Sequence, residues 1–158
     1  MTTESQAHRV RVNEPIVLGR RYDYADEYEV HGPEVEPCPP EDWVAAGLDA
    51  TPKWVGRVVK LLGVDASDAS GGGIGGWDII ESTPDVIHLE QSLPLIQVVF
   101  VGRNVEPTHR TLTTALTYDR PLIGRLVWSV IGIAHRRTAR RLITAVPDGA
   151  PAPGDVRR

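Results

Sequence analysis

The feature that most constrains the fold is an apolar run at residues 95–103, where Leu, Ile, Val and Phe fill most positions. Strands with one solvated face alternate apolar and polar residues, whereas a nearly unbroken run of β-branched and aromatic residues indicates burial on both faces. The chain is therefore expected to contain a sheet in which this strand is covered on both sides.

Four further segments are predicted as strands. Residues 21–31 alternate apolar and charged side chains, and residues 109–118 alternate Leu and Tyr with Thr and Ala, as half-buried strands do. Residues 77–82 and 85–92 flank a Thr-Pro pair that is typical of a hairpin turn. Most of residues 77–118 is thus expected to be strand.

Two short helices are predicted after the first strand. The first begins at Pro40, because proline is tolerated in a first helical turn, and it ends at Gly47. The second begins at Thr51 as N-cap, carries Trp54 on its apolar face, and ends at Gly63. These helices separate the first strand from the remaining ones.

The last predicted element is a long helix over residues 121–145, in which apolar residues recur at helical spacing. Leu126, Val130 and Ala134 are expected to face the sheet. The order of strand, two helices, several strands and a final helix predicts an α+β fold with helices on one face of an antiparallel sheet.

The length of 158 residues fits one domain. Residues 1–19 are expected to form a flexible leader, residues 20–146 the folded domain, and residues 147–158 a Pro- and Gly-rich tail.

Composition excludes several classes of protein. The net charge of −4 gives no support for nucleic-acid binding as the main activity. The longest apolar stretch, residues 122–134, is interrupted and falls short of the ~20 residues that span a membrane. A single cysteine, Cys38, allows no internal disulfide. We expect a cytoplasmic protein without a membrane span.

Four short motifs give the chain a resemblance to a known family. They are DYAD at 23–26, PKWV at 52–55, VIHLE at 86–90 with Glu where Asp is more usual, and LIGRL at 122–126 followed by HR at 135–136. With the predicted order of elements, they resemble an uncharacterised bacterial domain-of-unknown-function family of the START and polyketide-cyclase-like (SRPBCC) superfamily. Over residues 20–145, the resemblance implies the helix-grip fold, an antiparallel sheet wrapped on the long C-terminal helix, with a cavity between them.

A candidate acid–base pair lies in the strand at residues 85–92. His88 and Glu90 are two residues apart, so both side chains point to one face, where a carboxylate can orient an imidazole as a general base. We expect this pair at the polar pole of the cavity. In the alternative arrangement, Ile87 and Leu89 point inward and the pair faces solvent.

Aromatic side chains with polar tips suit a pocket for an amphipathic molecule, although each Trp could equally fill the core. The expected ligand-binding residues are Tyr24, Trp54, Trp77, Gln97, Tyr118, Trp128 and His135.

No cofactor or metal is expected. Gly71, Gly73 and Gly76 match G-x-G-x-x-G, but a predicted strand follows them instead of the helix that dinucleotide binding needs. The five histidines show no helical or hairpin spacing for metal ligands.

The sequence therefore predicts a domain that binds a small, largely apolar or amphipathic molecule, either as a binding protein or as a cyclase- or isomerase-like enzyme. Whether a reaction is catalysed is left open. The alternative is a non-enzymatic interaction module or a homodimer, for which the apolar run at residues 95–101 could supply the contact.

Overall fold

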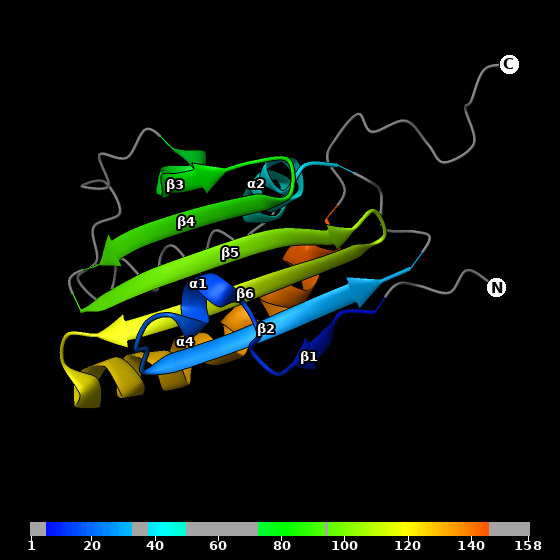
Figure 1. The fold of residues 1–158 in the computed structure, drawn as a ribbon. Coiled ribbons are helices and arrows are strands. Elements are labelled where there is room, and N and C mark those ends of the chain that lie inside the picture. Colours follow the sequence, from blue (N-terminus) through cyan, green and yellow to red (C-terminus); the bar gives the residue numbers. More distant parts are fainter. Residues whose placement is uncertain (1–5, 33–37, 50–72, 94, 146–158) are drawn as a thin grey trace, which may run out of the picture.

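The computed structural model describes residues 6–32, 38–49, 73–93 and 95–145. It is an α+β structure with a six-stranded antiparallel sheet and a long C-terminal helix (Figure 1), which confirms the predicted class. The strands are β1 (His8–Val10), β2 (Tyr24–His31), β3 (Asp78–Ser82), β4 (Val86–Leu93), β5 (Ile96–Glu106) and β6 (His109–Tyr118), in the spatial order β1-β2-β6-β5-β4-β3.

The apolar run lies in β5, between β4 and β6 in the sheet. Its alternate side chains enter two different cores: Phe100 lies in one, and Val99 and Val101 lie in the other. The prediction that this strand is buried on both faces is therefore confirmed. β3 and β4 meet at the predicted turn, where the Thr83 N–H donates to the Val86 carbonyl at 2.8 Å.

Each face of the sheet has its own cover. The face under α2 (Pro40–Asp49) and α4 (Pro121–Ile143) is called the helix face, and the face under α1 (Pro15–Leu18) is called the cap face. In Figure 1, α4 passes behind the sheet and α1 lies in front of it. The helix-face core consists of Tyr28, Val30, Trp43, Val44, Ile87, Leu89, Phe100, Leu112, Ala139, Leu142 and Ile143. The cap-face core consists of Val17, Val86, Val99, Val101 and Ala115.

The predicted helix at Pro40 is present and ends at Asp49. Glu41 and Asp42 lie in its first turn, where acidic groups interact favourably with the helix dipole. Trp43 is buried, and its indole Nε1 donates to Asn104 Oδ1 at 3.1 Å. The predicted second helix at residues 51–63, and Trp54 with it, lie outside the described residues.

The orientation predicted for the final helix is wrong for two of three residues. Ala134 is buried, but Leu126 and Val130 are exposed by 69% and 64%. The reason is that α4 is apolar on two sides, so periodicity alone does not choose between them. Small residues allow the closest approach to the sheet: a Cβ at Gly124 would lie 2.5 Å from Cγ of Tyr118.

The segment predicted as a leader is part of the fold where the structure describes it. β1 pairs with β2 in antiparallel register, and Val17 of α1 is buried in the cap-face core. A three-residue strand and a four-residue helix are too short to give a periodic signal, which is why the leader prediction is wrong there. Residues 147–158 lie outside the described part.

A pair of substitutions tests the orientation of α4. At concentrations where the chain is monomeric, Val130→Asp should change the free energy of unfolding by less than about 0.5 kcal/mol, because within one chain the side chain faces water. Ala134→Asp should lower it by about 2 kcal/mol or more, because it buries an unpaired charge. Urea denaturation of both variants measures the difference, and equal effects would contradict the orientation described.

Candidate functional site

Asp26 is a carboxylate buried on the helix face. The two-residue period of β2 places Tyr24, Asp26 and Tyr28 on one side of the strand, under α4. Asp26 is only 1% exposed, and its Oδ2 accepts a hydrogen bond of 2.6 Å from the Tyr24 hydroxyl. A buried carboxylate costs several kcal/mol unless it is well paired, so its surroundings decide what it can do.

α4 supplies the other members of this group. His135 Nε2 lies 3.4 Å from Asp26 Oδ1. The Trp128 ring lies between two neighbours, with its centroid 4.9 Å from that of Tyr24 and 5.0 Å from that of His135. Trp128 and His135 are seven residues apart, which places them on one side of a helix. Three predicted ligand-binding residues, Tyr24, Trp128 and His135, therefore converge on Asp26.

Two hydroxyl groups complete the cluster. Thr114 lies directly opposite Asp26 in the β2–β6 register, and Tyr28 is the next residue along the same face of β2. The Thr114 Oγ1 and Tyr28 OH atoms are buried and have no hydrogen-bond partner among the described residues. The group is called the Asp26 site, and it consists of Tyr24, Asp26, Tyr28, Thr114, Trp128 and His135.

Electrostatics in the site favour neutral phenols beside one carboxylate. Burial raises the pKa of the Tyr24 hydroxyl, and the hydrogen bond to Asp26 raises it further. Burial also raises the pKa of Tyr28, with the Asp26 charge adding to the effect. Both phenols thus remain proton donors, and the carboxylate can orient the His135 imidazole as an acid–base group.

Sequence reasoning missed Asp26 as a site residue. The available signal was the position of Asp26 in the alternating pattern of β2. It lies between Tyr24 and Tyr28, on the face that alternation assigns to the core. An acidic residue at such a position is either paired or functional.

His88 and Glu90 lie on the cap face. The two side chains do share a face, and Arg20 Nη1 donates to Glu90 Oε1 at 2.8 Å. His88 Nε2 lies 3.0 Å from the same oxygen, but this buried nitrogen forms no hydrogen bond within the described residues. The expected position between the sheet and the C-terminal helix is wrong, because Ile87 and Leu89 occupy the helix-face core.

The alternative arrangement is correct in that Ile87 and Leu89 point inward. Of the pair, however, only Glu90 reaches solvent, with 33% of its side chain exposed, whereas His88 is 3% exposed under the cap. Alternation decides which side chains share a face, but it cannot show that both faces are covered. His88 therefore packs as an interior residue of the cap face.

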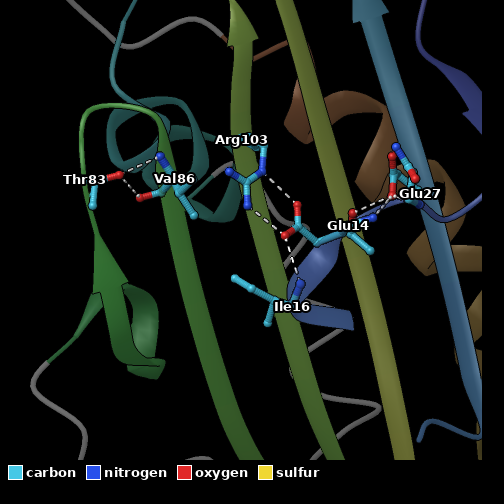
Figure 2. A network of polar contacts seen from close by, with 8 residues as sticks. Glu14, Ile16, Glu27, Thr83, Val86 and Arg103 are labelled. Atoms are coloured by element: carbon cyan, nitrogen blue, oxygen red, sulfur yellow. Dashed lines mark hydrogen bonds and ion pairs between the residues drawn. The ribbon is translucent and has the colours of Figure 1, made fainter. Parts of the chain in front are cut away.

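A polar network holds the cap to the sheet (Figure 2). Arg103 donates through Nε and Nη2 to the buried Glu14 carboxylate at 2.9 and 2.8 Å, and this pairing raises the pKa of Arg103. Glu27 Oε2 accepts from the Thr113 hydroxyl at 3.1 Å and from the Asn13 N–H at 2.9 Å. These donors and acceptors pair with one another, so the network acts structurally.

The other predicted ligand-binding residues do not join the Asp26 site. Trp77 packs on Phe100 with ring centroids 5.7 Å apart. Tyr118 is buried against Gly124, and Gln97 is exposed. Trp77 and Tyr118 are therefore core residues, and Gln97 lies away from the site.

The glycine motif leads into a strand. Its described part forms a short 3₁₀ turn, Ile74–Gly76, and β3 follows at Asp78. The helix that a dinucleotide-binding loop requires does not follow this turn, as expected. Within the described residues, no helix is long and apolar enough to cross a membrane.

Comparison with known proteins gives no family: no family model matches the chain, and no curated protein or solved structure is significantly similar to it. The resemblance to the helix-grip family therefore remains a prediction.

The tyrosines allow a test by pH. Burial raises the pKa of all four, Tyr22, Tyr24, Tyr28 and Tyr118. In the native protein, tyrosinate absorbance at 295 nm should appear only above the ordinary pKa of ~10, while the urea-unfolded chain should titrate near ~10. The unfolded state then loses its protons first, so the free energy of unfolding should fall as pH rises above ~10. A native titration step at or below that pH would contradict these environments.

Proposed function

We propose that this protein binds a small, largely apolar or amphipathic molecule between the sheet and α4, with the Asp26 site as the polar pole. The observation that carries the proposal is the buried Asp26 carboxylate beside two hydroxyls, of Tyr28 and Thr114, that lack partners among the described residues. Buried polar groups are normally satisfied, and unsatisfied ones are costly. A ligand carrying hydrogen-bonding groups would satisfy them.

The surroundings of the site favour such a ligand. An apolar cluster borders it on the helix face, formed by Ile96, Leu116 and Tyr118 with Tyr24, Leu95, Val98, Val127 and Trp128 packed against them. Ligand sites typically combine apolar walls with a few convergent polar groups. The Tyr28 and Thr114 hydroxyls can donate to a carbonyl oxygen, while the carboxylate can accept from a hydroxyl or an amine.

The contact between Asp26 and His135 also supplies an acid–base pair. An imidazole oriented by a buried carboxylate can accept a proton from a bound molecule and return it elsewhere. His135 retains some exposure at 16% of its side chain, so its ring can exchange protons with solvent. The proposal therefore includes proton transfer of the kind that an isomerase or cyclase needs, without requiring it for binding.

The helix-grip assignment is part of the proposal. Supporting it are the antiparallel sheet, the pairing of β2 with β6, and the final helix across one face. Two motifs of the resemblance supply site residues, since DYAD contains Tyr24 and Asp26, and HR begins with His135. The cytoplasm remains the expected compartment.

Asp26→Asn tests the site directly. The variant keeps the shape, and its amide oxygen can still accept from the Tyr24 hydroxyl, so it should fold. Binding of a hydrophobic fluorophore, followed by quenching of tryptophan emission, should weaken at least tenfold, or ~1.4 kcal/mol. Native mass spectrometry of the purified parent checks independently for a retained molecule.

Asp78→Asn is the matched control, because Asp78 is exposed on β3, at the far edge of the sheet. It should bind the fluorophore like the parent. The proposal fails if Asp26→Asn also binds like the parent, or if quenching of the parent does not saturate.

A second candidate function, self-association, rests on a different observation. Leu122, Leu126, Val130 and Ile133 are exposed by 83%, 69%, 64% and 55%, and their spacing forms one stripe along α4. Contiguous exposed apolar side chains mark interaction surfaces. In the run at residues 95–101, which suggested a dimer contact from the sequence, Val99, Phe100 and Val101 are buried in the two cores of the sheet, so α4 offers the larger exposed apolar surface.

We infer that a second copy of the chain covers this stripe. An antiparallel pair of α4 helices related by a two-fold axis would place Leu126 of each copy against Val130 of the other. The same arrangement brings the exposed Arg137 near the exposed Asp119 of the second copy. α4 contains five arginines and no acidic residue, so acidic groups at its ends offer complementary charge.

Leu126→Glu tests the pairing. In sedimentation velocity, the parent should be dimeric in the micromolar range, and the variant should be monomeric with unchanged circular dichroism, because Leu126 faces outward. Leu18→Glu is the matched control, since Leu18 is 62% exposed but lies on α1. It should remain dimeric. A monomeric parent, or a dimeric Leu126→Glu, would exclude this contact.

A further inference from the structure

Three potential metal ligands meet on the cap face, at one end of the β2–β6 pair. Glu29 and His31 are two residues apart on β2, so they share a face. His109, the first residue of β6, lies directly opposite His31 in the register. One ligand atom from each of the three side chains lies within 4.8 Å of the others. Asp26 points to the opposite face of β2, so this cluster is separate from the Asp26 site.

The distances fit a common metal ion. Glu29 Oε2 lies 3.4 Å from His31 Nε2 and 3.7 Å from His109 Nε2. In a tetrahedral zinc site, bonds of about 2.0–2.2 Å place neighbouring ligand atoms roughly 3.3–3.6 Å apart. The two imidazole rings are stacked, with centroids 3.7 Å apart and planes at 25°, and both direct Nε2 toward the same carboxylate.

The hydrogen bonding of the cluster is incomplete without a further partner. His109 Nε2 is buried and has no hydrogen-bond partner among the described residues. A divalent cation would supply that partner, because it binds imidazole nitrogen and carboxylate oxygen together.

We propose that Glu29, His31 and His109 bind a divalent transition-metal ion, with Zn²⁺ as the best-fitting case. Imidazole nitrogen together with one carboxylate oxygen suits zinc and its first-row neighbours, whereas calcium and magnesium prefer sites built wholly of oxygen. The side chain of His31 is 56% exposed, so a fourth position can be filled from solvent. The ion would join the end of β2 to the start of β6.

Equilibrium dialysis of chelator-treated protein against ZnCl₂, followed by elemental analysis, tests the proposal. The parent should bind one Zn²⁺ per chain, and bound Co²⁺ should give the visible absorption of a four-coordinate site. His31→Ala should weaken zinc binding at least about tenfold, because it removes one of three protein ligands. This variant should fold normally, since the His31 side chain is largely exposed. Glu29→Gln and His109→Ala should weaken binding similarly.

His135→Ala is the matched control, because His135 lies on α4 under the opposite face. It should bind zinc with the stoichiometry and affinity of the parent, and so should Asp26→Asn. Circular dichroism of each variant separates a lost ligand from a lost fold. Absence of saturable one-to-one binding by the parent, or unchanged affinity in a folded His31→Ala, would overturn the proposal.

Discussion

The burial of β5 on both faces is the constraint from which the other layers follow. A strand that presents Phe100 to one side and Val99 and Val101 to the other cannot leave either side in water. The helix face is covered by α2 and α4, whose apolar side chains pack against it. The cap face is closed by a much shorter segment, and the buried pairing of Glu14 with Arg103 supplements its small apolar contact.

This unequal covering explains where polar groups lie in the interior. On the cap face, the Glu14 and Glu27 carboxylates pair with the Arg103 guanidinium and with backbone N–H groups, so they stabilise the packing of the cap on the sheet. On the helix face, Asp26 has Tyr24 and His135 as partners, but the neighbouring hydroxyls of Tyr28 and Thr114 are left over. Surplus hydrogen-bonding capacity distinguishes the candidate site from the Glu14–Arg103 and Glu27 pairs. It does not distinguish the site from the whole cap face, where Tyr22 OH, His88 Nε2 and His109 Nε2 also lack partners among the described residues.

Much of the fold could be predicted from the sequence, because strand alternation, Pro40 and the long apolar spacing of α4 are local signals. It was harder to predict which side of each helix or strand faces the core. α4 is apolar on two sides up to Ile133, and only contact with the sheet shows that Ala134 faces inward while Val130 does not. Tyr24, Trp128 and His135 could be selected by chemistry, whereas the meeting of Glu29 and His31 with His109 depends on a strand register that no local pattern contains.

The pairing of β2 with β6 has a consequence for how the chain reaches this structure. β2 ends at His31, but its partner strand β6 ends only at Tyr118. Glu14 and Arg103, which pair across the cap, are 89 residues apart in the sequence. During synthesis, β2 must therefore persist without its main neighbour until nearly the whole sheet has left the ribosome. Contacts so distant in sequence close slowly. β2 carries three acidic residues, Asp26, Glu27 and Glu29. Charged side chains disfavour the pairing of an exposed strand with a wrong edge.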